Sequence, residues 1–244
     1  MNIHHREDVS ASGWTRREWF GMAGGAAVAS LALGTHALGV QLFYATTPAG
    51  CVASPTIEEG PYFIDDKLDR SDIRTDPTTG KQCQGTPLEL TLSVVAVGKN
   101  NCKPLAGAIV DVWHCDAAGA YSEFKDPNFG DLRGKKFLRG FQITDSSGVA
   151  RFTTIYPGWY PGRAVHIHYK VRTPDGKEFT SQMFFDEKVT DQVHSIAPYD
   201  RPGKRRLNVD DEIYRDQGGK KSILALSSKN GGSYAATYSI GMMV

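Results

Sequence analysis

Two histidines separated by one residue, His166 and His168, form the most distinctive chemical pattern in this sequence. They lie in the segment 163–171, whose apolar residues alternate as in a β-strand. Because alternate side chains of a strand point to the same face, both imidazoles share one face, about 6.6 Å apart at Cα for a rise of ~3.3 Å per residue. Two imidazoles at this spacing can bind one metal ion. The pattern alone fits two surface histidines on a polar face equally well.

Two tyrosines precede the histidine pair, each presented by a loop next to a strand. A Pro-Gly pair lies on each side of Tyr160, so this residue is expected on a constrained loop just before the histidine strand. Tyr121 follows the segment 108–114, where a predicted strand ends and a loop begins. A tyrosine hydroxyl has an ordinary pKa near ~10, so it is a poor ligand at neutral pH unless a cation lowers that pKa.

Four motifs along the chain resemble those of the intradiol ring-cleavage dioxygenases, a family that includes catechol, hydroxyquinol and protocatechuate dioxygenases. The resemblance covers most of the chain from about Pro55 to Phe185, and it looks like the short, exported branch of that family. Four motifs in the same order are far more specific than one. The motifs are Glu59-Gly60-Pro61-Tyr62, the pattern VWH…GAYS that ends at Tyr121-Ser122, PGWY ending at Tyr160, and RAVHIH from Arg163 to His168.

The resemblance implies a ferric ion, Fe(3+), held by Tyr121, Tyr160, His166 and His168. It also implies that Tyr160 and His168 are axial ligands and that Tyr121 and His166 are equatorial. The chemistry agrees, because two phenolates and two neutral imidazoles suit ferric iron better than zinc or copper(I). With one bound hydroxide, three negative charges balance the three positive charges of the ion. Such a site can be partly buried without a large desolvation penalty.

The same resemblance implies a reaction in aromatic compound catabolism. A catechol would react with O₂ and be cleaved between its two hydroxylated carbons, giving a cis,cis-muconate-type product. Arg163 and Tyr160 are the implied catalytic residues, the first stabilising negative charge and the second accepting a substrate proton. Tyr62, Gln182 and Trp159 are the implied lining of the substrate pocket, although Trp159 by its type is chiefly a packing residue.

Two features depart from the pattern of the classical members. Ala164-Val165 stands where those members have Pro-Ala before the first histidine. A helical N-terminal dimerisation region like that of the catechol enzymes is not expected here. The oligomeric state is therefore open, with a homo-oligomer as one alternative.

The hydropathy pattern predicts an all-β fold, an antiparallel β-sandwich of the transthyretin (prealbumin) type. Segments 88–97 and 108–114 are expected to pair as a hairpin. Turn signals join 139–144 to 149–155, and 164–171 to 178–185, and no convincing long helix is present. Residues 51–86 are rich in turn formers and read as an irregular N-terminal arm. The tail beyond Arg201 should wrap the sandwich or form an oligomer contact.

Residues 1–50 are expected to be a targeting segment that is not part of the fold. Arg16-Arg17 precedes a weakly hydrophobic stretch rich in Gly and Ala, which favours a twin-arginine export signal, with an uncleaved membrane anchor as the alternative. The catalytic domain is then 51–244, and the expected location is periplasmic or extracellular, without a stable membrane span in the mature form. The formal net charge is +1, and basic and aromatic residues do not alternate, so nucleic acid is a poor candidate partner.

The four cysteines, at positions 51, 83, 102 and 115, do not form a CxxC pair, which disfavours a zinc ribbon. In an exported protein an even number permits two disulfides, whose connectivity the sequence leaves open. Cys102 and Cys115 are expected not to pair, because a hairpin would place them at opposite ends of an extended strand.

Two other functions compete with the dioxygenase. One is a transthyretin-like binding module that keeps the fold without iron chemistry, and the other is a zinc hydrolase built on the histidine pair. Retention of four ligand candidates and Arg163 weighs against the first, and the lack of a nearby carboxylate base weighs against the second. The identity of the catechol stays open. His114 is expected to be a hydrogen-bonded structural histidine, and His194 to lie in an exposed polar loop.

Overall fold

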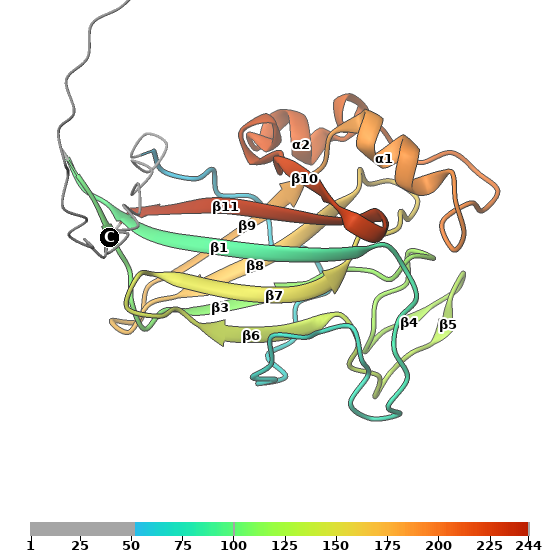
Figure 1. The fold of residues 1–244 in the computed structure, drawn as a ribbon, viewed down its shortest axis with the longest axis horizontal. Helices are drawn as coiled ribbons and strands as arrows, with labels where there is room; N and C mark the ends of the chain where they lie inside the picture. Colours follow the sequence, from blue (N-terminus) through green and yellow to red (C-terminus); the bar gives the residue numbers. More distant parts are fainter. Residues whose placement is uncertain (1–51, 100, 244) are drawn as a thin grey trace, which may run out of the picture. The chain divides into compact units, whose positions relative to one another are not determined.

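The computed structural model describes residues 52–99 and 101–243. The predicted export signal, residues 1–50, lies outside the described residues and stays a prediction. The described chain is mostly β, as predicted, and its strands form two main sheets that face each other (Figure 1). No helix of the described residues is long and apolar enough to cross a membrane.

One sheet is built around β1, which pairs with β2, β7 and β11, while β10 pairs with β11. The other sheet has the order β6-β3-β8-β9, and a small third sheet pairs β4 with β5. The strands are β1 (Pro87–Val97), β2 (Cys102–Pro104), β3 (Ile109–Trp113), β4 (Lys125–Asp126), β5 (Gly130–Asp131), β6 (Arg139–Ile143), β7 (Val149–Ile155), β8 (His166–Arg172), β9 (Glu178–Phe184), β10 (Leu226–Lys229) and β11 (Ser233–Met243). The helices are α1 (Glu187–His194) and α2 (Glu212–Asp216), with short 3-10 helices at Asn208–Asp210, Gly219–Ser222 and Asn230–Gly232.

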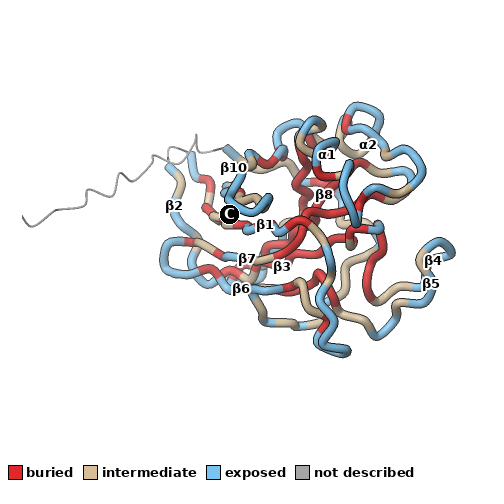
Figure 2. Tube along the Cα trace, turned by 45° about the vertical axis from the view of Figure 1, so that its right-hand side comes forward, coloured by how far each residue is buried: buried red, intermediate tan, exposed pale blue. Residues whose placement is uncertain are grey.

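The hydrophobic core lies between the two main sheets. On β1, every second residue from Leu88 to Val94 is at most 1% exposed, which is the alternation that predicted this strand. On β8, Ile167 and Tyr169 are fully buried in the same core. Figure 2 shows buried segments running along β3 and β8 in the interior. Because side chains alternate along a strand, His166 and His168 lie on the face of β8 that points away from this core.

Two predicted strand arrangements need correction. The predicted hairpin of 88–97 with 108–114 is wrong, because β1 and β3 lie in different sheets. The turn at 145–148 forms as predicted, but the strands on its two sides, β6 and β7, also belong to different sheets. Each of these strands has an apolar face, and the faces cover each other across the core instead of lying side by side. The predicted hairpin of β8 with β9 is confirmed.

The C-terminal tail does more than wrap the sandwich. Its last strand, β11, pairs in parallel with β1 from Leu88↔Tyr234 to Val97↔Met243. The antiparallel prediction is therefore wrong for this pair, and the sheet is mixed. A parallel pair needs a long connection between its strands, and most of the chain separates β1 from β11. β11 is stabilised in the sheet because Ala236, Ile240 and Met242 are buried in the core.

The cysteines occupy different environments. Cys102, at the start of β2, is disulfide-bonded, whereas Cys83 and Cys115 are free thiols. The prediction that Cys102 and Cys115 are not bonded to each other is thus confirmed, although the hairpin from which it was argued does not form.

Two turn glycines offer a matched test of the sandwich. Gly148 and Gly176 both have left-handed backbone, with φ of +74° and +85°. A Cβ at position 148 would lie 2.5 Å from the carbonyl oxygen of Val94, whereas at position 176 it would meet nothing within 4 Å. We expect Gly176→Ala to lower the free energy of unfolding by about 1 kcal/mol through backbone strain alone, and Gly148→Ala to lower it further. Urea unfolding of both variants measures this, and equal losses would contradict the packing described.

Candidate metal centre

Four predicted ligand side chains meet at one place beside the second sheet. His166 and His168, at the start of β8, are 2% and 0% exposed, and their Nε2 atoms lie 2.9 Å apart. The hydroxyl of Tyr160 lies 3.3 Å from Nε2 of His166. The Tyr121 ring centre is 5.7 Å from that of Tyr160 and 6.3 Å from that of His168. The structure therefore brings together all four residues that the sequence placed at the metal.

Both imidazoles are neutral and direct Nε2 at the shared point. Nδ1 of His166 lies 2.6 Å from the carbonyl oxygen of Ala164, which can only accept, so this nitrogen is the donor and Nε2 keeps its lone pair. Burial, and next the charge of Arg163, lower the pKa of His166 to about 3. Burial lowers the pKa of His168 well below its ordinary value. Neutral imidazole is the form that binds metal ions.

The phenol oxygens show that the residues present fit a hard cation. The Tyr121 hydroxyl is buried without a hydrogen bond of normal geometry among the described residues, and the Tyr160 hydroxyl is the polar group that interacts with it. Burial raises the pKa of both Tyr121 and Tyr160 well above the usual value, so without a cation both are protonated. A buried hydroxyl without a hydrogen bond of normal geometry is costly, and a trivalent ion between the four donors would satisfy it and lower both pKa values. The described residues contain no group of three His, Cys, Asp or Glu side chains suited to a metal.

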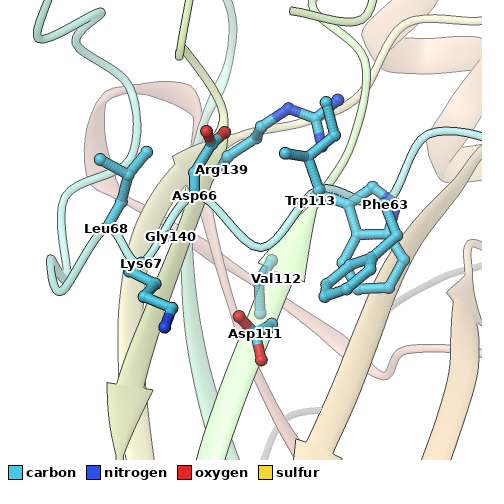
Figure 3. A pocket seen from close by; sticks show the side chains of 10 residues that line it. Phe63, Asp66, Lys67, Leu68, Asp111, Val112, Trp113, Arg139 and Gly140 are labelled. Carbon is cyan, nitrogen blue, oxygen red and sulfur yellow. The ribbon is translucent and has the colours of Figure 1, made fainter. Parts of the chain in front are cut away.

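Aromatic rings hold the ligand side chains from behind. The Trp113 ring stacks on His168, with centres 4.9 Å apart and planes at 8°, and Phe63 packs against Trp113 at 4.9 Å. Figure 3 shows Phe63 and Trp113 side by side, with Arg139 nearby. On the other side, the Tyr62 ring stacks on Tyr121 at 4.0 Å. These contacts fix the ring planes before any ligand binds.

Arg139 connects the two loops that carry Tyr62 and Tyr121. Its Nε donates to the Ser122 hydroxyl at 2.8 Å, one terminal nitrogen donates to the Ser122 carbonyl at 2.8 Å, and the other donates to the Tyr62 carbonyl at 2.5 Å. The side chain comes from β6 and the residue is only 3% exposed. Sequence reasoning missed Arg139, since an arginine at the start of a predicted strand carries no local signal for such a role.

The predicted catalytic residue Arg163 is fixed by two partners. Its Nε donates to Oδ2 of Asp211 at 3.0 Å, and a terminal nitrogen donates to Oε1 of Gln182 at 2.6 Å. Gln182, fully buried, in turn donates to the carbonyl oxygen of Glu58. Gln182 was predicted to line the substrate pocket, and its contacts here are with Arg163 and the N-terminal arm.

Asp211 is the second residue that sequence reasoning missed. Its Oδ2 also accepts from the backbone N–H of Ala164 at 2.8 Å, and its Oδ1 accepts from Ile213 N as the N-cap of α2. Burial alone would raise the pKa of Asp211, but its bonds from Ala164 and Arg163 hold it below the usual value. The carboxylate thus anchors the segment whose Ala164 carbonyl orients His166. The only available signal was an aspartate directly before a short helix.

A cavity of about 180 Å³ opens next to the four candidate metal ligands. Tyr121 and Tyr160 form part of its wall, together with Tyr62, Phe124, Phe129 and Asp126. Tyr62, which was predicted to line the substrate pocket, is one of the residues that line this cavity.

Trp159 does not line this cavity. It lines a separate one with His194 and Arg201, and the guanidinium carbon of Arg201 lies 3.7 Å from the Trp159 ring centre. His194 was expected in an exposed polar loop, which is wrong. It ends α1, stacks on Tyr199 and donates from Nε2 to the carbonyl oxygen of Pro157.

His114 is a structural histidine, as predicted. It is 1% exposed, its Nδ1 donates to the carbonyl oxygen of Cys115 at 2.7 Å, and its Nε2 accepts from the Thr154 hydroxyl at 2.6 Å.

Comparison with known proteins decides the family. A family model described as dioxygenase matches residues 58–201. An intradiol ring-cleavage dioxygenase structure from Tetranychus urticae is 34% identical, with a TM-score of 0.69, and the match covers 79% of this chain and 95% of that one. This chain belongs to the intradiol ring-cleavage dioxygenase family. The family found from the sequence motifs is thereby confirmed, and the assignment to its exported branch stays a prediction.

Two further relatives match with lower identity. Chlorocatechol 1,2-dioxygenase from Pseudomonas putida is 31% identical over 115 residues, which is 38% of this chain and 42% of that protein. The dioxygenase domain of a carbohydrate-binding fusion protein from Streptomyces sp. SirexAA-E is 28% identical, with a TM-score of 0.58, over 79% of this chain and 99% of that one. The chain spans less than half the length of the first curated relatives that it matches.

The burial of His114 predicts a loss of stability in acid. Burial lowers its pKa to about 4, from an ordinary value of 6.5. Between pH 4 and pH 6.5, His114 is therefore protonated in the unfolded chain and neutral in the folded one. The free energy of unfolding therefore has its full value, as far as His114 is concerned, above pH 6.5. It falls by about 3 kcal/mol as the pH drops to about 4. Free energies of unfolding across this range should decline less for His114→Gln than for the wild type, and parallel curves would contradict the assignment.

Asp211 should contribute more to stability than its exposed neighbour Asp210. In Asp211→Asn, Arg163 Nε and Ala164 N both lose a charged acceptor. We expect the free energy of unfolding to fall by roughly 2–3 kcal/mol. Asp210→Asn is the matched control, because no hydrogen bond or ion pair involves its side chain among the described residues. Its loss should stay within about 0.5 kcal/mol. Similar urea midpoints for the two variants would rule out this role for Asp211.

Proposed function

We propose that this protein is a non-heme iron dioxygenase that holds Fe(3+) with Tyr121, Tyr160, His166 and His168. It cleaves the ring of a catechol between the two hydroxylated carbons with O₂, giving a cis,cis-muconate-type product. The convergence of two neutral imidazoles and two phenols carries this proposal, because the two phenols also line a cavity that could hold a substrate. The names of the relatives, catechol and chlorocatechol 1,2-dioxygenases, support it.

Charge explains why this ligand set selects the ferric ion. Two phenolates and one bound hydroxide would balance three positive charges, so the ion could occupy a site whose histidines are fully shielded from water. When bound, ferric iron draws electron density from the catechol ring and makes the ring reactive toward O₂. Thiolate ligands would favour softer metals, and Cys115 does not take part, because it is a free thiol whose sulfur points at the Gly158 carbonyl.

Tyr160 has the position required of a proton acceptor. Its hydroxyl lies 3.3 Å from His166 Nε2 and its ring forms part of the cavity wall, so it can reach both the ligand cluster and a bound substrate. As a phenolate, its oxygen would take the proton of a catechol hydroxyl and become neutral. Tyr121 is more deeply buried, at 5% exposed, and stacked under Tyr62, so it would remain a fixed ligand.

Arg163 supplies a fixed positive charge beside this reaction. Its side chain is 14% exposed, and its guanidinium is oriented by hydrogen bonds to Asp211 and Gln182. A charge held in place before the reaction stabilises negative charge on the ring without any cost of reorientation. The alternative, a transthyretin-like binding module without iron chemistry, would need neither this arginine nor its supports.

Two substitutions separate a permanent ligand from a proton acceptor. His166→Ala removes a ligand, so the iron content per chain should fall. Tyr160→Phe keeps three ligands and nearly the same ring volume, so much of the iron should remain, while oxygen uptake with catechol slows by roughly 10²-fold or more.

The control is Tyr169→Phe. This hydroxyl is buried like that of Tyr160, but Tyr169 lies on β8 and faces the core, where Tyr238 is its neighbour, instead of the four candidate ligands. Iron per chain, the visible tyrosinate-to-iron absorption and oxygen uptake are measured for all three variants. Full activity in Tyr160→Phe would refute its role as base, and a colourless wild type that takes up no iron would refute the proposed function.

A further inference from the structure

The substrate cavity carries a single charged side chain. Among the residues that line it, Asp126 is the only one with a formal charge, and the others are aromatic, glycine, proline or Asn128. Asp126 ends β4, in the small hairpin of β4 and β5. Its Oδ1 accepts from the backbone N–H of Asn128 at 2.7 Å. No cation of the described residues forms an ion pair with it, so its charge is not cancelled locally.

The arginines near the cavity interact with groups other than Asp126. Arg163 pairs with Asp211, and Arg139 donates to Ser122 and the Tyr62 carbonyl. Arg201 lies 5.8 Å from the Phe129 ring centre, but its guanidinium packs on Trp159 and donates to the Trp159 carbonyl. None of these three arginines lines the cavity.

The position of Asp126 relative to the reacting atoms follows from the proposed reaction. The two hydroxyl groups of a catechol must face Tyr160 and the fully buried ligand cluster. The opposite edge of the ring, which carries any further substituent, must then face the outer part of the cavity. Asp126 is half-buried and Asn128 is exposed, so this hairpin forms the outer part. A substituent on the substrate would therefore meet the carboxylate of Asp126.

We infer that Asp126 determines the charge preference of this cavity, so that the protein selects catechols with neutral or cationic substituents and disfavours catechols with a carboxylate substituent. This inference rests on the proposed function and names the substrate class of the same site. A carboxylate on the ring would be desolvated beside an unpaired Asp126, whereas an ammonium group would pair with it. The resulting preference should be on the order of tenfold for each unit of charge at a partly exposed site, and it should weaken with added salt.

Asp126→Asn tests this inference, because the amide keeps an oxygen to accept from Asn128 N and removes only the charge. Asp131→Asn is the matched control, since Asp131 lies on the same hairpin, is exposed and pairs with Arg133 outside the cavity. Three probes have substituents of similar size and different charge: 4-ethylcatechol, 4-(2-aminoethyl)catechol and 3,4-dihydroxyphenylacetate. For the iron-loaded wild type and both variants, kcat/KM is measured by oxygen uptake, and Kd is measured by calorimetry under anaerobic conditions.

In Asp126→Asn, the kcat/KM ratio of the anionic to the neutral probe should rise about tenfold, and that of the cationic to the neutral probe should fall about tenfold. The Kd ratios should shift in the same sense, and Asp131→Asn should leave all ratios unchanged. Unchanged ratios in Asp126→Asn, with the neutral probe cleaved, would overturn the inference alone. Charge-selective binding without cleavage of any probe would overturn the proposed function alone, and no binding of any probe would overturn both.

Discussion

The hydrogen bond from His166 Nδ1 to the Ala164 carbonyl is the contact on which the rest of the site depends. It fixes the tautomer and the ring plane of the first histidine, and it leaves Nε2 free at 2.9 Å from the second. The peptide that supplies this carbonyl is itself held through its N–H by Asp211. A histidine ligand whose other nitrogen is anchored in this way binds its metal more tightly and in a defined orientation. The carboxylate of Asp211, in the C-terminal tail, therefore orients His166 indirectly, through the Ala164 peptide.

The sandwich explains how such a site can be both buried and rigid. β8 lies inside the second sheet between β3 and β9, so its backbone is hydrogen-bonded on both sides. One face of the strand is packed into the core, which prevents a shift of register that would turn both histidines inward. The other face is closed by Trp113 and Tyr62, which stack on a histidine and a tyrosine respectively. Loops that would otherwise move, above all the one that carries Tyr121, are tied to this frame by Arg139.

The cavity combines two opposite electrostatic demands. Under the proposed function, Arg163 and a trivalent ion would favour negative charge on the hydroxylated edge of the ring. At the outer edge, the carboxylate of Asp126 would disfavour it. Arg163 does not line the cavity and Asp126 does, so the two groups would act on different parts of one substrate molecule. Such a division would let one small pocket promote catechol ionisation and still discriminate between substituents.

The sequence alone predicted the four candidate ligands, because the motifs that carry the family resemblance are local, such as the HxH spacing on a strand and a tyrosine between two Pro-Gly pairs. It also determined strands whose alternation is continuous, such as β1, and the β8–β9 hairpin, whose turn residues are adjacent. Only the tertiary structure decided which strands pair across long connections. β3 does not pair with β1 or β2, which precede it, but lies in the other sheet, and β11 pairs with β1 in parallel. The supports Arg139 and Asp211, and the placement of Trp159 outside the pocket, likewise depend on contacts between segments far apart in the chain. A buried charged side chain takes its partners from whatever the fold brings near it, and no local pattern encodes them.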